Sequence, residues 1–278
     1  MKNYNMSNVN IFLITAGLLV SGLVHSSSDI IHELNTRYAN AVDVCDNNRP
    51  AYYCSGVLIR GTASTASDEY KPWEPSEHAI TLGSTSFSFL RKDINIKKLY
   101  RTNGFLFNEQ SKSEEQGTDI AYRCSFPYEA DTLSRPGHGC STPAPETAVS
   151  CASLGINNVT QWLEYMVSIN SKIESMCSFS TDSPTAFLTS ILAHDSGQTS
   201  LVPAPDIPED GDYNEILLQT WALHQTLPVQ AFWFIEGDET AKAEALNDRE
   251  SYYVERGIYV PVVIINLKKH DAPFTGAL

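Results

Sequence analysis

The stretch YYCSGVLIRGTAST, residues 52–65, is the clearest strand pattern in the chain. Aromatic and aliphatic residues form a run that a Gly-Thr pair ends, which is typical of a core strand. Arg60 closes this run, where another aliphatic residue would fit. A guanidinium is always charged and carries five hydrogen-bond donors. Its position at the mouth of a buried strand therefore indicates either an anion site or an ion pair with a surface carboxylate.

A second predicted strand lies in ITLGSTSFSFLRKD, residues 80–93. Ser84, Ser86 and Ser88 alternate with Phe87 and Phe89, so one side of the strand is expected to carry hydroxyls and the other to face the core.

Apolar periodicity predicts the remaining elements. Helices are expected over residues 28–44, 159–177, 183–195, 213–225 and 238–257, and further strands over 103–109, 227–237 and 258–269. Pro261 indicates an edge position or a bulge in the last strand. Residues 117–151 are turn-rich and predict an ordered insertion held by disulfides. This mixture predicts an α+β fold with a mixed sheet and flanking helices.

The N-terminus has the pattern of a secretory signal, with Lys2 before the apolar run Ile11–Val24. We expect cleavage after Ser26, which leaves residues 27–278 as a single catalytic domain that is secreted and has no membrane contact. An uncleaved single-span anchor is the alternative.

The cysteines agree with export, because an even number in an exported chain favours disulfides. The sequence has no C-x-x-C motif. Short loops close at the lowest entropic cost, so we expect neighbours in sequence to pair. The expected disulfides are Cys45–Cys54, Cys124–Cys140 and Cys151–Cys177.

Charge and missing motifs exclude several classes of function. The formal net charge is -14, which disfavours nucleic-acid binding because phosphate neutralisation supplies much of that affinity. A nuclease that uses His138 or His194 remains a weak alternative for the same reason. The sequence lacks G-x-S-x-G, H-E-x-x-H and the glycine patterns of phosphate-binding loops. We therefore expect no metal site and no bound cofactor.

Three polar segments occur in an order that resembles one class of ADP-ribosyltransferases: an arginine at a strand end, a Ser-Thr-Ser stretch, and a late carboxylate. The candidate substrate-binding residues are Arg60, Gly61, Thr62, Ser84, Thr85 and Ser86. A guanidinium can hold the diphosphate of NAD with two bonds, and hydroxyls can position the ribose. A carboxylate would stabilise the positive charge that develops as the nicotinamide–ribose bond breaks.

The candidate acids are Glu250, Asp248 and Glu244, in that order of preference. Asp248-Arg249-Glu250 is the closest match to the E-x-E pattern of the transferases, but it falls on a predicted helix instead of before a strand. Glu244 and Asp248 are four residues apart and would share a helix face, whereas Glu250 would point elsewhere.

At greater length the chain resembles the halovibrin family, secreted NAD-consuming proteins of vibrios. The stretches that carry this resemblance are RPAYYCSGVLIRGT, TSFSFLRKD, NGFLF, CSFPYEADTLSRPGHGC, LGINNVTQWL, LPVQAFWF and YYVERGIYVPVV. The resemblance implies an ADP-ribosyltransferase-like fold and an exported NAD glycohydrolase or ADP-ribosyltransferase. NAD is then the substrate, and transfer would also require a protein that accepts ADP-ribose. The alternative is a disulfide-stapled binding module, such as an adhesin, without catalysis.

Overall fold

The computed structural model describes most of the chain after the predicted signal. The described residues are 27–62, 71–75, 79, 84–94, 96–107, 121–130, 149–170, 172–199, 213–219 and 227–278.

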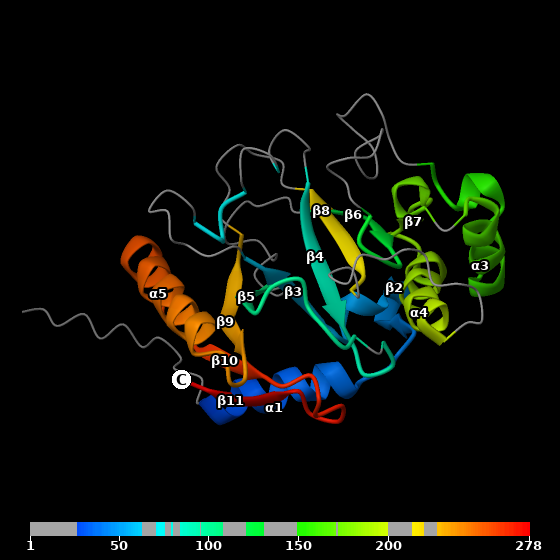
Figure 1. The fold of residues 1–278 in the computed structure, drawn as a ribbon. Coiled ribbons are helices and arrows are strands. Elements are labelled where there is room, and N and C mark those ends of the chain that lie inside the picture. Colours follow the sequence, from blue (N-terminus) through cyan, green and yellow to red (C-terminus); the bar gives the residue numbers. More distant parts are fainter. Residues whose placement is uncertain are drawn as a thin grey trace, which may run out of the picture.

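A mixed nine-stranded sheet organises these residues, with the order β11-β10-β9-β5-β3-β4-β8-β6-β7 (Figure 1). Only β9 and β10 pair in parallel among its described ladders; the other neighbours are antiparallel. The strands are β3 (Val57–Gly61), β4 (Thr85–Leu90), β5 (Asn103–Phe107), β6 (Ala121–Phe126), β7 (Phe179–Ser180), β8 (Glu215–Gln219), β9 (Val229–Ile235), β10 (Val262–Ile265) and β11 (Phe274–Ala277). The predicted α+β class with a mixed sheet and flanking helices is confirmed.

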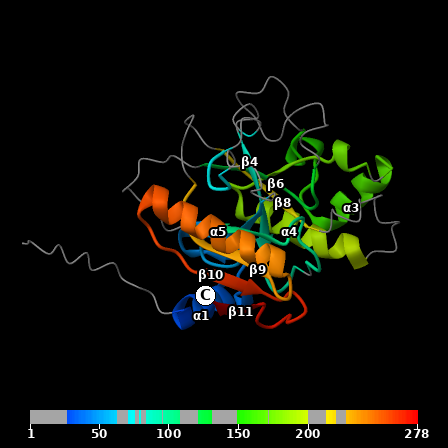
Figure 2. The same ribbon diagram turned by 60° about the vertical axis from the view of Figure 1, so that its left-hand side comes forward.

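Within the described part of the chain, four α-helices flank the sheet: α1 (Ser27–Ala39), α3 (Val159–Ser168), α4 (Pro184–Thr199) and α5 (Glu239–Arg256). Helix α5 lies along β9, while α3 and α4 lie at the opposite end of the sheet (Figures 1 and 2). Helix α1 packs against β11. The ends of α5 follow from sequence, because Asp238 accepts a hydrogen bond from the Ala241 amide and Gly257 takes a left-handed φ of 68°.

The sheet supports two apolar cores. The larger one contains the aromatic residues of β4, β5 and β9, and the smaller one surrounds Trp162 and Phe126. Helix α4 joins them, since Phe187 packs in the larger core and Ala193 in the smaller one.

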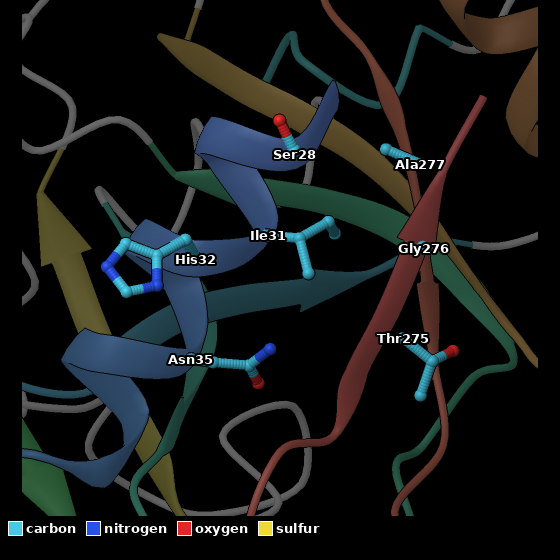
Figure 3. Close-up of a pocket in the computed structure, with 7 residues that line it drawn as sticks. All are labelled: Ser28, Ile31, His32, Asn35, Thr275, Gly276 and Ala277. Atoms are coloured by element: carbon cyan, nitrogen blue, oxygen red, sulfur yellow. The ribbon is translucent and has the colours of Figure 1, made fainter. Parts of the chain in front are cut away.

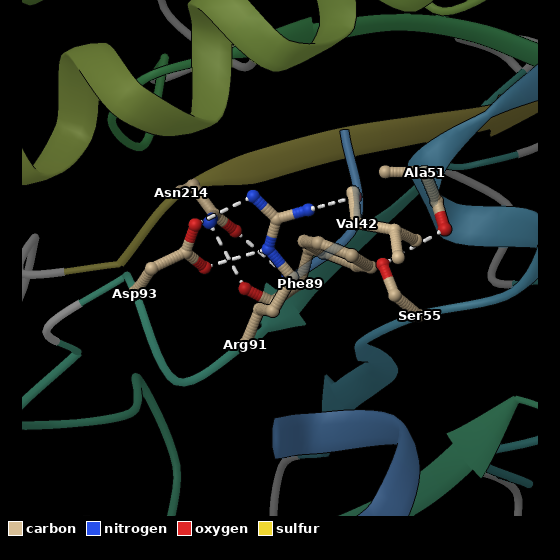
Figure 4. A network of polar contacts seen from close by, with 7 residues as sticks. All are labelled: Val42, Ala51, Ser55, Phe89, Arg91, Asp93 and Asn214. Carbon is tan, nitrogen blue, oxygen red and sulfur yellow. Dashed lines mark hydrogen bonds and ion pairs between the residues drawn. The ribbon is translucent and has the colours of Figure 1, made fainter. Parts of the chain in front are cut away.

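Strand β4 changes its partner along its length and so connects the two halves of the sheet. Residues 88–90 pair with β3, whereas residues 85–87 pair with β8. Beyond the end of the β4–β8 ladder, the side chain of Asn214 replaces the backbone partner of Phe89. Its Oδ1 accepts from the Phe89 amide at 2.7 Å, and its Nδ2 donates to the Phe89 carbonyl at 3.0 Å. Figure 4 shows this contact beside buried Arg91, whose guanidinium binds Asp93 with two bonds.

Several predicted elements differ from the structure. Residues 213–225 were expected to form a helix, but β8 occupies residues 215–219. Its residues 215–218 are buried between β4 and β6, and a short apolar run fits a buried strand as well as a helix. Residues Ala51–Tyr53 form a 3₁₀ helix, so the strand predicted around Arg60 begins only at Val57, as β3. Two short strands, β1 (Val44–Cys45) and β2 (Arg49–Pro50), precede it.

The chain also contains strands that the sequence pattern did not predict. Strand β6 lies inside the segment expected to be only an insertion, and β11 follows β10. Because β11 covers β10, the last predicted strand is not at the edge of the sheet, and Pro261 lies just before it.

The disulfides Cys45–Cys54 and Cys151–Cys177 are both present, as predicted. Cys124 is also disulfide-bonded, and its predicted partner Cys140 lies outside the described residues. The disulfides indicate an oxidising, non-cytoplasmic environment. Among the described residues, no helix combines the length and the apolar character needed to cross a membrane.

Replacing Asn214 with Ala should lower the free energy of unfolding by about 2–4 kcal/mol, because the buried N–H and C=O of Phe89 both lose their partner. Urea denaturation measures the change. The matched control is Asn157→Ala at an exposed position, which we expect to change stability by less than about 0.5 kcal/mol. Equal effects of the two substitutions would contradict the proposed role of Asn214.

Candidate functional site

The strongest candidate site lies where β3 and β4 separate. Their ladder runs from Val57↔Leu90 to Ile59↔Ser88 and then stops. In a continued ladder Gly61 would lie opposite Ser86. Instead, the guanidinium of Arg60 donates from Nη1 to the Ser86 carbonyl at 2.7 Å. An arginine side chain thus replaces a backbone partner at this opening.

The backbone of Arg60 is held from two strands away. The indole Nε1 of Trp233, on β9, donates to the Arg60 carbonyl at 3.2 Å. Gly104 lies between them, and a Cβ atom at Gly104 would lie 1.9 Å from that carbonyl oxygen. Glycine is therefore required at position 104, and the anchored backbone fixes where the Arg60 side chain begins.

Four polar side chains at this opening share one face of the sheet. The guanidinium of Arg60 lies 5.9 Å from the Phe87 ring, and Arg60 is the register partner of Phe105. Because side chains alternate along a strand, positions two residues from these three also point to that face. These positions are Thr62, Thr85 and Asn103. We call Arg60, Thr62, Thr85 and Asn103 the β3–β4 fork.

Each fork residue has a buried polar atom without a hydrogen-bond partner: Nε of Arg60, Oγ1 of Thr62, Oγ1 of Thr85 and Nδ2 of Asn103. Thr62 and Thr85 are 1% exposed, and Asn103 is 3% exposed. An unsatisfied buried donor or acceptor typically costs about 1–3 kcal/mol. Four of them on one face indicate a site whose partners come from a bound molecule or from water.

Among the described residues, the only charged group of the fork is the Arg60 guanidinium. None of the described carboxylates forms an ion pair with Arg60, so the alternative of a surface ion pair finds no partner among them. In a chain with a formal net charge of -14, such an arginine favours an anionic ligand.

The structure brings together only part of the predicted hydroxyl set. Thr85 lies on the fork face, whereas the alternation along β4 directs Ser84 and Ser86 to the other face. Ser86 contributes its backbone carbonyl instead. Gly61 also faces away from the fork, where an added Cβ would lie 2.9 Å from Cβ of Arg101.

The three acid candidates differ in their burial on α5. Glu250 is exposed and pairs with Arg249 at 2.9 Å, and Glu244 is half-buried. Asp248 is 1% exposed and belongs to the buried face of α5, together with Ala245 and Tyr252.

This buried face of α5 lies on the same side of the sheet as Arg60. The Tyr252 ring contacts Phe232 at 5.8 Å, and Phe232 is the register partner of Phe105, which in turn pairs with Arg60. Of the three candidates, Asp248 is therefore the one directed towards the sheet on the fork side.

Other carboxylates near the end of β9 have local roles. Hydrogen bonds from the Ala241 amide and the Thr102 side chain lower the pKa of Asp238, which caps α5. Glu236 accepts a hydrogen bond from Asn266.

Asn103 was missed by the sequence analysis. The only signal was a polar residue at the start of NGFLF, where every other position is Gly or apolar. Asn103 becomes a candidate because the strand register places it on the same face as Arg60 and Phe105. The register between strands cannot be inferred from the sequence of one strand.

Histidine and metal chemistry find little support among the described residues. His194 is fully buried in α4, and its Nδ1 lies 2.7 Å from the Pro127 carbonyl. His138 lies outside the described residues. Within the described part of the chain, no group of three or more His, Cys, Asp or Glu residues could hold a metal ion.

A hollow between α1 and β11 has a volume of about 500 Å³ (Figure 3). Ile31 and Asn35 point from α1 towards residues 275–277 of β11, and Ser28 and His32 complete the lining. Its lining contains no carboxylate and no arginine, and the Asn35 amide is already bonded to the Phe274 backbone. The fork therefore remains the better candidate.

No family model and no curated protein matches this sequence.

Replacing Thr62 or Thr85 with Val should leave the free energy of unfolding unchanged or raise it by up to about 1 kcal/mol, because valine removes an unsatisfied buried hydroxyl. The control is Thr189→Val, which removes a hydroxyl that donates to the Thr185 carbonyl at 2.9 Å and should lower stability by about 0.5–1.5 kcal/mol. Thermal and urea unfolding measure both. Losses at Thr62 and Thr85 as large as the loss at Thr189 would show that the fork hydroxyls are satisfied.

Proposed function

We propose that the protein cleaves the nicotinamide–ribose bond of NAD, as an exported NAD glycohydrolase or ADP-ribosyltransferase. The observation that carries this proposal is the β3–β4 fork, where Arg60 and three buried polar side chains have unsatisfied hydrogen-bonding atoms on one face of the sheet. Arg60, Thr85 and Asp248 also follow one another in the order of the transferases that the sequence resembles.

In this proposal Arg60 holds the diphosphate. Its Nη1 is fixed by the Ser86 carbonyl, which leaves Nε as a donor for a phosphate oxygen. A guanidinium suits this task because its charge is permanent and its donors lie in one plane. The Thr62 and Thr85 hydroxyls, which can both donate and accept, would bind the nicotinamide ribose.

We propose Asp248 as the carboxylate that stabilises the oxocarbenium-like transition state. Its burial on the fork side of α5 supports it over exposed Glu250 and half-buried Glu244. A carboxylate in a poorly solvated position interacts more strongly with developing positive charge than one in water. Hydrolysis then needs only water as acceptor, whereas transfer also needs a protein acceptor.

Export through cleavage of the N-terminal signal is part of the proposal. The disulfides support it, because such bonds persist in oxidising compartments.

A binding module is the second candidate, and an exposed apolar patch favours it. Tyr253, Val254, Ile258 and Tyr259 are all exposed where α5 ends, with Val254 at 83%. The rings of Tyr253 and Tyr259 are 6.1 Å apart, and Arg249 lies over Tyr259. Exposed apolar patches of this kind often mark protein-interaction sites.

The direct test is to incubate the purified mature protein with NAD and to measure free nicotinamide by chromatography. We expect release that depends on enzyme concentration. Absence of release at micromolar protein over several hours would reject the enzyme in favour of the binding module.

Arg60→Lys should lower kcat/KM for NAD by at least about tenfold, equivalent to about 1.4 kcal/mol, because a lysine keeps the charge but lacks the planar set of guanidinium donors. The control is Arg49→Lys at an exposed position, which should keep the parent rate. If kcat/KM for NAD is unchanged in Arg60→Lys, Arg60 does not bind the diphosphate and has a purely structural role.

Asp248→Asn should lower kcat by about a hundredfold or more while largely retaining NAD affinity, because only the transition state carries the positive charge. Glu250→Gln and Glu244→Gln serve as matched controls on the same helix and should retain the parent rate. Circular dichroism checks that each variant is folded. A large loss in Glu250→Gln with full activity in Asp248→Asn would reverse the assignment.

A further inference from the structure

Asn103 has a side-chain donor that the fold does not use. It opens β5, and its backbone carbonyl accepts from the Thr62 amide at 3.0 Å. Its side chain is nevertheless buried, and Nδ2 has no partner.

Two other asparagines of this chain use the side-chain amide to bond the backbone of a strand. Asn214 binds both the N–H and the C=O of Phe89, and Asn35 binds both the N–H and the C=O of Phe274. In both cases the side chain replaces a missing strand partner. Asn103 lies inside the sheet, between β3 and β9, where neighbouring strands already supply the backbone partners. Its Nδ2 is therefore available as a donor to a ligand.

We infer that Asn103 binds the carboxamide oxygen of the nicotinamide ring and selects for that leaving group; this inference rests on the proposed function. The argument comes from matching donors and acceptors. The anionic oxygens of NAD suit Arg60, and its ribose hydroxyls suit threonines that both donate and accept. The carboxamide carbonyl is a neutral group that only accepts, which matches the neutral donor Nδ2.

The distance between Arg60 and Asn103 allows one dinucleotide to place its diphosphate at Arg60 and its carboxamide at Asn103. Asn103 is one strand away from Arg60 and two residues further along, which corresponds to about 8 Å between their Cα atoms. A ribose with its base can extend over such a distance, so the diphosphate and the carboxamide can be held at the two positions together. A buried donor rejects a ligand that lacks its acceptor, because the donor then stays unsatisfied.

The test is a cycle of two proteins and two dinucleotides. Parent protein and Asn103→Leu are each assayed with NAD and with an analogue in which unsubstituted pyridine replaces nicotinamide. We measure kcat/KM from release of the base and the dissociation constant by calorimetry. With NAD, Asn103→Leu should lower kcat/KM at least about tenfold. With the pyridine analogue, parent and variant should differ by less than about threefold, since neither can form the bond.

An equal loss with both dinucleotides would overturn the inference and make Asn103 a structural residue. If the parent releases no nicotinamide, the proposed function fails, and calorimetry then decides on Asn103 separately. If the parent binds NAD more tightly than the analogue and Asn103→Leu binds both equally, the inferred contact between Asn103 and the carboxamide is supported. If the parent binds both dinucleotides with equal affinity, or binds neither, the contact is rejected. Asn103→Ala, checked by circular dichroism, replaces the leucine variant if that variant does not fold.

Discussion

The fold depends on the change of partner along β4. This strand belongs to both halves of the sheet, with residues 88–90 bonded to β3 and residues 85–87 bonded to β8. At each point where a ladder stops, a side chain takes its place: the Asn214 amide at Phe89, and the Arg60 guanidinium at Ser86. The two replacements differ in their consequences, because the neutral amide is fully bonded whereas the guanidinium keeps a free donor.

The end of β4 that Asn214 bonds therefore has a structural role, whereas the end that Arg60 bonds is the candidate functional site. Around Asn214 the polar groups are paired, and buried Arg91 is neutralised by Asp93. Around Arg60, one buried atom each of Thr62 (Oγ1), Thr85 (Oγ1) and Asn103 (Nδ2) has no hydrogen-bond partner. A sheet gains no stability from such groups, so their presence on one face is better explained by a ligand that provides acceptors. The same opening of the sheet places the Arg60 guanidinium beside these three side chains, which is the basis of the proposed anion site.

The sequence predicted much of this fold because periodicity and caps act locally. The range of α5 follows from Asp238 and Gly257, and β4 from its serine and phenylalanine alternation. Strand β8 was missed because a short run buried on both faces has no period that distinguishes it from a helix. For the site, Arg60 and Thr85 were identified from motifs. Asn103 and the burial of Asp248 depend on register and on helix packing across the sheet, and neither is encoded in a single stretch.

The central claim is that the β3–β4 fork binds the dinucleotide. The most direct measurement is a crystal structure of the protein with ADP-ribose, the product that retains the diphosphate. The account predicts diphosphate oxygens within hydrogen-bond distance of the Arg60 guanidinium, and a ribose hydroxyl bonded to Thr62 or Thr85. Ligand density between α1 and β11, or a fork that holds only water at millimolar ADP-ribose, would contradict it.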